Sequence, residues 1–431
     1  MIVLFKILQV ILALSLLIIV HEAGHFLFAK LFHIRVEKFY LFFDVGGKAL
    51  LKFKKGETEF GIGWLPFGGY CKISGMIDES MDLESMKKEP QEWEFRCHPA
   101  WQRLLVMAGG VLFNFIFAIL AFSIISGIWG SAYIPNQQAQ IYPNELARDM
   151  GFHSGDHIIS IDDYEPSDFS SLQADLIRRE GHKVQVLRGT DTVNVYMDQA
   201  RTAEILNSPM MFDLALPFIV DSVSAPENAK ELDRGDRILS IDGQSTEFFQ
   251  DAQPVLKACA GRTAEAQILR DGQVVTAPIQ VDSAGKIGIY LKAPNVERRH
   301  YNALESVGQG VKRTGSTITG YVQDLKLVAK PSTGAYKSVG SFIAIGQVFP
   351  SKWDWFQFLN IVALLSIMLG VMNLIPIPGL DGGHILFTLY EMVSGRKPSE
   401  KFLMVMQIIG MFLLFMLMFL AFGNDISRLI K

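Results

Sequence analysis

Cysteine is scarce in this chain, with three residues in 431, at Cys71, Cys97 and Cys259. They lie far apart and form no C-x-x-C pair, which argues against a disulfide framework and against a cysteine-based metal site. The topology argued below places only Cys259 in an oxidising compartment, where a lone thiol has no partner. We therefore expect three unpaired thiols.

Charge is also sparse. Asp, Glu, Lys and Arg make up 19% of the residues, whereas a soluble domain carries about a quarter. The formal net charge is -4, and neither a basic stripe nor an acidic tail is present. The sequence therefore gives no reason to expect a nucleic-acid partner.

Long apolar segments take the place of the missing charge. A membrane-spanning helix needs roughly 20 apolar residues, and four segments are long enough. They run from Ile2 to about Phe32, from about Leu104 to Trp129, from about Phe356 to Ile377 and from about Phe402 to Phe422. The first continues past His25 without a small-residue cleavage site, so we do not interpret it as a cleaved signal peptide.

Positive charge next to the spans predicts their orientation, because loops rich in Lys and Arg stay in the cytoplasm. The basic residues between spans one and two and between spans three and four are Arg35, Lys38, Lys48, Lys52, Lys54, Lys55, Lys72, Lys87, Lys88, Arg96, Arg103, Arg396, Lys397 and Lys401. Both loops are therefore expected to be cytoplasmic, and the long loop between spans two and three to lie in a bacterial periplasm or its equivalent.

The long loop contains an internal repeat. The sequence GDHIISID at 155–162 returns as GDRILSID at 235–242. Each copy reads as a Gly-Asp turn, a short apolar strand and an Asp-centred turn, which predicts two small β-rich domains in tandem. The pattern resembles PDZ domains, which bind peptides by adding a strand to a sheet edge. We expect the repeated aspartates to be structural, and the sequence leaves open whether the domains bind a substrate terminus or obstruct bulky substrates.

The segment from about Tyr301 to Lys330 carries apolar residues at helical spacing. It could lie on the membrane surface as an amphipathic helix or pack against the second β-rich domain, and both alternatives stay open.

The first span contains His21-Glu22-Ala23-Gly24-His25, an H-E-x-x-H motif. Residues four apart share one face of a helix, so both imidazoles can bind one zinc ion, with Glu22 beside them as a base. The alternative is a polar helix end without a metal. Three ionisable side chains within an apolar helix are costly unless they bind something, so the motif predicts a metal site.

A catalytic zinc needs a third protein ligand and an open position for water. The third span ends in NLIPIPGLDGG at 373–383, where Pro376 and Pro378 break the helix and hold Asp381 on irregular backbone. Asp381 is the preferred ligand, and His384 is a rival three residues on.

Together these motifs resemble the site-2 protease family of intramembrane zinc metalloproteases, in particular the bacterial branch with tandem PDZ domains. The similarity covers nearly the whole chain. It implies zinc ligation by His21, His25 and Asp381, with Glu22 as general base. It also implies that Asn373 contacts the substrate backbone or supports the oxyanion.

The resemblance extends to two further segments. Related proteins carry a membrane-associated β-hairpin with a GGY-x-K signature, which Gly68-Gly69-Tyr70 matches here, and the hairpin could bind a substrate strand; an ordinary cytoplasmic hairpin is the alternative. Asn114 in the second span is expected either to contact substrate or to pack in the bundle. The family has proline where Gly110 stands, and we expect this departure to leave the catalytic core untouched.

The predicted fold class is therefore a polytopic α-helical membrane protein of four transmembrane helices, with a membrane-associated β-hairpin region and two tandem PDZ-like α+β domains. The expected segments are 1–32 (first span), 33–103 (cytoplasmic loop with a re-entrant hairpin), 104–130 (second span), 131–209 and 210–297 (PDZ-like domains), 298–355 (amphipathic helix and linker), 356–383 (third span), 384–401 (cytoplasmic loop) and 402–431 (fourth span and tail).

The predicted function is hydrolysis of a peptide bond in single-span membrane proteins at a Zn²⁺ centre, in a bacterial inner membrane. By resemblance, the substrate would be a membrane-bound anti-sigma factor already trimmed by another protease, or a remnant signal peptide. The alternatives are a catalytically silent PDZ scaffold, which needs neither HEAGH nor Asp381, and a metal transporter, which would place ligands along several spans.

Overall fold

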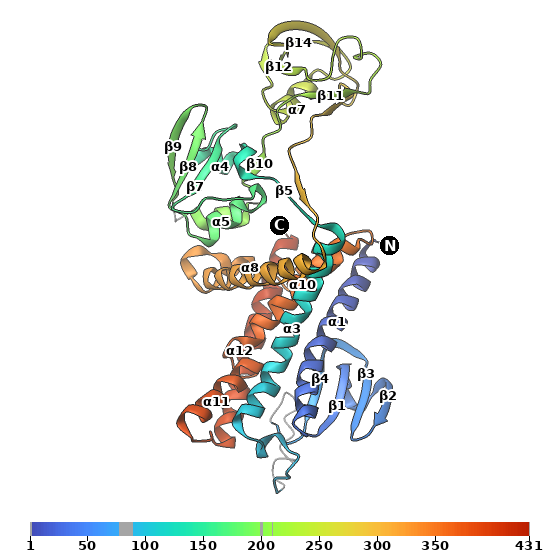
Figure 1. Cartoon of the computed structure of the whole chain (residues 1–431), viewed down its shortest axis with the longest axis vertical. Coiled ribbons are helices and arrows are strands. Elements are labelled where there is room, and N and C mark those ends of the chain that lie inside the picture. Colours follow the sequence, from blue (N-terminus) through green and yellow to red (C-terminus); the bar gives the residue numbers. More distant parts are fainter. Residues whose placement is uncertain (1, 77–88, 199–200, 209, 431) are drawn as a thin grey trace. The chain divides into compact units, whose positions relative to one another are not determined.

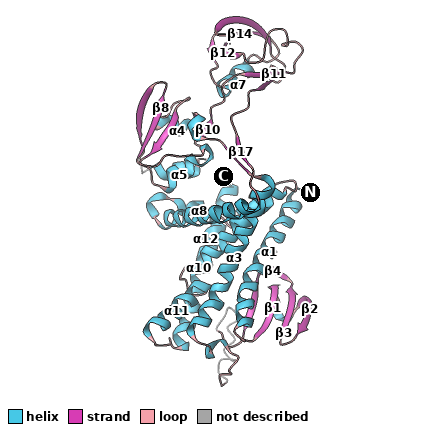
Figure 2. Ribbon diagram, viewed as in Figure 1, coloured by secondary structure: helices cyan, strands magenta, loops and turns pink. Residues whose placement is uncertain are grey.

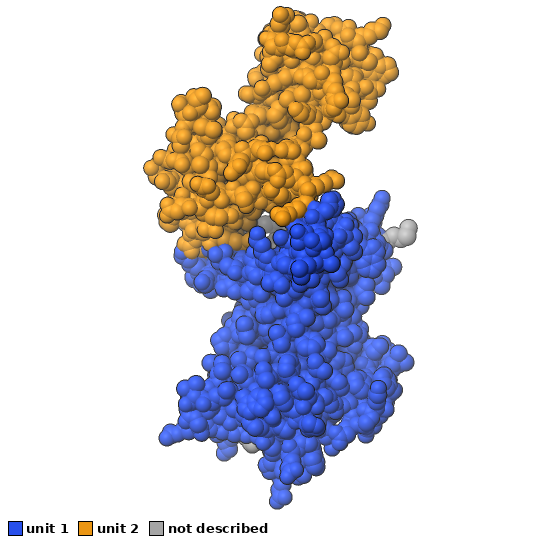
Figure 3. All heavy atoms as spheres, viewed as in Figure 1, with its two compact units in different colours: residues 1–130, 300–331, 335–431 blue, residues 131–299, 332–334 orange. Residues whose placement is uncertain are grey.

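The computed structural model describes residues 2–76, 89–198, 201–208 and 210–430. The predicted basic residues Lys87 and Lys88 lie outside these ranges. The chain divides into two units, coloured separately in Figure 3. Unit 1 comprises residues 1–130, 300–331 and 335–431, and unit 2 comprises residues 131–299 and 332–334.

Unit 1 contains four long apolar helices, which run in roughly the same direction in the view of Figure 1. They are α1 (Ile2–Leu31), α3 (Ala100–Trp129), α10 (Trp355–Leu374) and α12 (Glu400–Ile430). Among the described residues, these four are long and apolar enough to cross a membrane. Together with the small β-sheet regions between them, they confirm the predicted fold class.

Two of the helix boundaries that differ from the predicted ones have a clear cause in proline. The second span begins at Ala100, directly after Pro99, because a proline is well placed at a helix start. The third ends at Leu374, since Ile375 precedes a proline and takes up extended backbone.

A short turn separates α10 from α11 (Asp381–Ser394), so that Asp381 is the first residue of a new helix. Gly379 in this turn has a φ of 101°, a value that side-chain-bearing residues rarely adopt. The backbone of Pro378 comes so close to Gly410 of α12 that no side chain fits there. The start of α11 is therefore fixed between two spans.

The segment predicted as a hairpin forms a four-stranded sheet in unit 1 (Figure 2). Its strands are β1 (Val36–Phe43), β2 (Ala49–Lys55), β3 (Thr58–Gly63) and β4 (Leu65–Ile73). The order is β2-β3-β1-β4, with β1 and β3 parallel. Strand β4 is an edge strand and packs against α1, where Gly69 comes close to Ile18.

Unit 2 contains two modules with separate hydrophobic cores. The first comprises β6 (Ile141–Pro143), α4 (Glu145–Asp149), β7 (His157–Ile161), α5 (Leu172–Arg178), β8 (Lys183–Arg188), β9 (Asp191–Tyr196), α6 (Thr202–Asn207) and β10 (Phe212–Leu214). The second comprises β11 (Val220–Val223), β12 (Arg237–Ile241), β13 (Gln244–Ser245), α7 (Phe249–Ala258), β14 (Thr263–Arg270), β15 (Gln273–Gln280) and β16 (Ile289–Leu291).

The repeated Gly-Asp turns have the same structural role in both modules. Asp156 accepts two hydrogen bonds of 2.8 Å from Arg188, and Asp236 accepts bonds of 2.8 and 2.6 Å from Arg270. In each module the aspartate thus ties the turn to the end of a later strand. A strand pair, β5 (Ser131–Tyr133) with β17 (Glu297–Arg299), joins the two ends of unit 2.

Helix α8 (Ala303–Ala329) covers the predicted helical segment and packs onto span α3. Gly310 of α8 lies directly against Ser123 of α3, and Ser306 lies beside Gly127. This contact with a span leaves the surface-lying amphipathic helix expected from the sequence as a prediction. The short helix α9 (Phe342–Val348) follows and packs against α1.

Candidate metal centre

Spans α1 and α3 come into backbone contact at the HEAGH motif. A Cβ atom placed on Gly24 would lie 2.2 Å from the carbonyl oxygen of Gly109, and one on Gly109 would lie 2.6 Å from that of Gly24. Small residues permit this close approach of two spans. The contact brings α3 directly beside the two histidines of the motif.

Three donor atoms form a nearly equilateral triangle. The Nε2 atoms of His21 and His25 are 3.3 Å apart, and each lies 3.3 Å from Oδ2 of Asp381. Both histidines are buried, and the Asp381 side chain is 16% exposed. Among the described residues, this is the group of three donors that could hold a metal ion.

The triangle fits zinc. Oxygen and nitrogen ligands bind zinc tetrahedrally at about 2.0–2.1 Å, which places neighbouring donor atoms about 3.4 Å apart. Oδ2 of Asp381 is buried and has no hydrogen-bond partner in the described part of the chain, although both imidazoles are near it. A cation between the three donors would satisfy it. His384, the rival ligand, follows in α11 and is not part of the group.

Each histidine is also contacted at its other ring nitrogen. Nδ1 of His25 lies 2.8 Å from the carbonyl oxygen of Val106 and can only donate there, which leaves Nε2 free to bind a metal. Nδ1 of His21 lies 3.1 Å from the side-chain amide of Asn114, which is fully buried. Within the described part of the chain the Asn114 amide oxygen has no other partner, so an amide turned to accept from His21 gives a partner to both the oxygen and the ring nitrogen. The structure therefore places Asn114 on a histidine of the metal site, and its predicted substrate contact remains a prediction.

Gly110 of α3 lies directly against the donor triangle. A Cβ atom there would be 2.4 Å from Nε2 of His25 and 2.6 Å from Cε1 of His21. The expectation that the Gly110 departure leaves the catalytic core untouched is therefore wrong. Sequence alone could not place a residue of the second span against a motif in the first, although the adjacent Gly109-Gly110 pair in a span is a signal of close helix packing.

Glu22 and Asn373 lie at the same site. The backbone of Cys71 in β4 lies next to the carboxylate of Glu22. Nδ2 of Asn373, near the end of α10, lies 3.2 Å from Nε2 of His21. The structure thus brings a carboxylate, an amide and a strand edge together around the donor triangle.

The Gly68-Gly69-Tyr70 segment lies within edge strand β4. The Tyr70 hydroxyl donates to Asp44 over 2.7 Å, and its ring stacks on Tyr40 and Phe43. Burial raises the pKa of Tyr70, and the hydrogen bond to Asp44 raises it further, so the phenol stays protonated. Tyr70 therefore anchors β4 within the sheet.

Comparison with known proteins agrees with this geometry. Residues 9–417 match the profile of peptidase family M50, and the chain belongs to this family. It is a membrane protein and a zinc metalloprotease of the M50 type, with His21, His25 and Asp381 forming its candidate metal site.

Relatives align along their whole length. A putative zinc metalloprotease of Vibrio cholerae is 29% identical over 99% of both chains. The protease RseP of Yersinia pestis is 30% identical over 97% of this chain and 98% of its own. The regulator of sigma-E protease RseP of Salmonella typhimurium is 28% identical over the same shares.

Proposed function

We propose that the chain is an intramembrane endopeptidase that cleaves single-span membrane proteins at the site formed by His21, His25 and Asp381. The observation that carries the proposal is the triangle of three donors 3.3 Å apart, set among apolar spans with Glu22 beside it. A site of this kind inside a helix bundle is costly to maintain unless it binds and acts on something.

Each group at the site is assigned a distinct chemical role. When bound, zinc supplies Lewis-acid chemistry and activates a water molecule at neutral pH. Glu22 takes the proton of the attacking water and returns one to the leaving amine. Asn373, whose amide nitrogen lies 3.2 Å from Nε2 of His21, donates an N–H to the oxyanion that develops on the scissile carbonyl.

Edge strand β4 supplies the binding surface. Its partner within the sheet is β1, and at Cys71 its other side faces Glu22. A substrate helix that unwinds can pair with the β4 edge that faces away from β1, which presents its backbone in extended form next to the base. Gly68 and Gly69 belong to this strand and let it pack closely against Phe43 and Ile18, and Asn114 supports the metal site from α3.

The names of the relatives support a substrate class. Because similar proteins are named for regulation of sigma-E, the proposed substrate is a pre-trimmed anti-sigma factor in the sigma-E stress response, with remnant signal peptides as a second group. The proposed location is a bacterial inner membrane with the two PDZ-like domains in the periplasm. The basic loops expected to be cytoplasmic meet at one end of unit 1, where Lys397 donates to the carbonyl oxygen of Arg96.

The test is cleavage of a single-span reporter in proteoliposomes, with zinc quantified in each protein. Glu22→Gln should keep zinc and lose at least about 100-fold in kcat, whereas Asp381→Asn should lose zinc. Glu57→Gln, an exposed glutamate at the β2–β3 turn, is the matched control and should cut normally. Full activity in Glu22→Gln would contradict the proposed base, and a wild-type protein without zinc or cleavage would favour the scaffold.

A further inference from the structure

An ion pair outside the group of three metal donors joins helices α3 and α11. Nη2 of Arg103 in α3 lies 2.5 Å from Oε1 of Glu391 in α11. The two side chains are 9% and 18% exposed. A charge-assisted bond in such a shielded place is much stronger than a surface ion pair.

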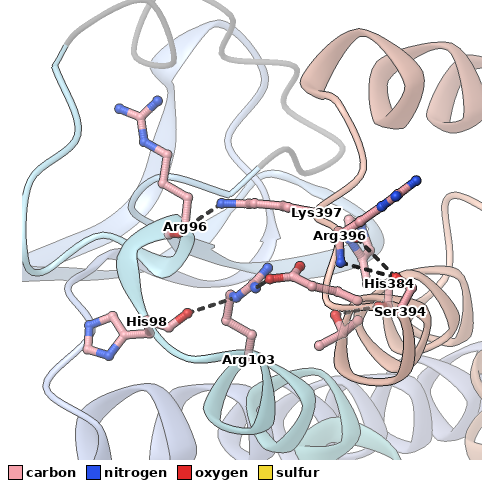
Figure 4. Close-up of polar contacts among 9 residues, drawn as sticks. Arg96, His98, Arg103, His384, Ser394, Arg396 and Lys397 are labelled. Atoms are coloured by element: carbon pink, nitrogen blue, oxygen red, sulfur yellow. Dashed lines mark hydrogen bonds and ion pairs between the residues drawn. The ribbon is translucent and has the colours of Figure 1, made fainter.

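Arg103 is also held by residues that precede it in the chain. Figure 4 shows it between His98 and the helix that carries His384 and Ser394. Its Nε donates to the carbonyl oxygen of His98 over 3.0 Å, and its guanidinium lies 5.9 Å from the ring centre of the buried Phe95. The guanidinium is therefore a fixed point to which Glu391 is bound.

The same stretch of α3 contacts the histidines. Val106, one turn beyond Arg103, accepts the hydrogen bond from His25, and Gly110 lies against both imidazoles. Residues 103–110 of α3 therefore contact α1 at the histidines and α11 at Glu391.

Helix α11 transmits this anchoring to the third donor. Asp381 is its first residue, and Glu391 lies ten residues on, about 15 Å along the helix axis. Between them, Ile385 packs on a core that includes Val106 and Met107 of α3. A helix fixed at both points cannot rotate or slide, so its first residue keeps its place relative to the histidines.

We propose that Arg103 and Glu391 are positioning residues of the metal centre, which set Asp381 at bonding distance from a zinc ion held by His21 and His25. This inference rests on the proposed ligand set. It could not be predicted from the sequence, in which Arg103 is only one of the positive charges of a loop expected to be cytoplasmic. Groups hydrogen-bonded to a metal ligand are typically worth 10–100-fold in metal affinity, and we expect this more remote pair to lie at the lower end.

The test uses the full-length protein in nanodiscs, with zinc affinity measured by chelator competition and the visible spectrum recorded after Co²⁺ substitution. Arg103→Gln and Glu391→Gln should each lower zinc affinity roughly 10-fold and change the cobalt spectrum. Arg103→Lys keeps the positive charge and should retain a higher zinc affinity than Arg103→Gln. It replaces Arg103→Gln in the test if that variant does not fold.

Two controls separate positioning from general stability. Lys397→Gln removes a neighbouring contact to the carbonyl oxygen of Arg96, and Arg270→Gln breaks a comparable ion pair in unit 2. Both should keep zinc affinity within about twofold of wild type, even where Arg270→Gln lowers the melting temperature.

Wild-type zinc affinity and an unchanged cobalt spectrum in Glu391→Gln would overturn the proposal, whatever happens to the melting temperature. Asp381→Asn separates this result from a failure of the ligand set: if it too keeps wild-type affinity, Asp381 is not a ligand and the proposed function must be revised.

Discussion

The ring of His21 is contacted on both sides. Its Nε2 faces the donor triangle, and its Nδ1 faces the buried amide of Asn114 at 3.1 Å. A histidine whose second nitrogen has a partner is held in one tautomer and one orientation, which raises its metal affinity.

Replacing Asn114 by leucine should therefore weaken zinc binding roughly 10–100-fold, because His21 loses the group that orients it. Chelator competition on the purified protein measures the effect. Asn228→Leu, a buried asparagine of unit 2 that donates to the carbonyl oxygens of Gln280 and Ile287, is the matched control and should leave zinc affinity unchanged. Equal affinities for wild type and Asn114→Leu would mean that the amide has no part in the site.

Gly110 supports a second prediction at the residue scale. Its missing side chain leaves room for both imidazoles, since a Cβ atom would lie 2.4 Å from Nε2 of His25. Gly110→Ala should therefore displace His25 and reduce zinc content at limiting metal at least about 10-fold. Gly315→Ala in α8, where no neighbour lies within 4 Å of the new Cβ, should bind zinc normally and gain about 0.5–1 kcal/mol in stability.

The residues that were predictable are those whose chemistry and spacing lie within one segment. HEAGH is local, and Asp381 stands out as a carboxylate between prolines and glycines in a span. The roles of Asn114, Gly110 and the Arg103–Glu391 pair depend on contacts between helices that are far apart in the sequence. No local pattern encodes which faces of two helices meet.

At the scale of elements, the sheet beside α1 shows the same limit. The hairpin was predicted from a resemblance carried by a short signature at Gly68-Gly69-Tyr70, which reports on neighbouring strands only. The parallel pairing of β1 with β3, which aligns Lys38 with Glu59, joins strands that are not consecutive. It therefore leaves no trace in the turns between them.

The second module of unit 2 gives a prediction on pH. Burial by itself raises the pKa of Asp236, but the hydrogen bonds from Arg270 more than offset this and hold it below its ordinary value of 3.8. Because the folded-state pKa is depressed, the aspartate's contribution to stability is present above pH 4 and is lost as the pH falls through the folded value.

Arg270→Gln should accordingly destabilise the module by about 3 kcal/mol at pH 7 and move its acid unfolding to higher pH, because only the effect of burial remains. Urea unfolding between pH 3 and pH 7 measures both changes. Arg234→Gln, which breaks the exposed pair with Asp221, should change stability by less than about 0.5 kcal/mol. The same acid midpoint in both variants would refute the assigned role of Asp236.

At the scale of the molecule, the two units differ in the environment that they require. Unit 1 contains the apolar spans, whereas each module of unit 2 has its own buried core. Residues 131–299, expressed alone, should therefore form a soluble monomer in detergent-free buffer with one or two cooperative unfolding transitions by circular dichroism. Aggregation or an unfolded spectrum would show that the modules depend on the spans.

The strand pair at the ends of unit 2 has a consequence for folding. Pairing of β5 with β17 aligns Tyr133 with Glu297 and Ser131 with Arg299. The long chain segment between these strands therefore begins and ends at the same place. Closing a loop of that length costs entropy that grows with the logarithm of its length. If unit 2 folds first, the entropy of loop closure is lost before α8 packs on α3. Helix α8 then meets Gly127 of α3 as readily as if a short loop joined the two helices.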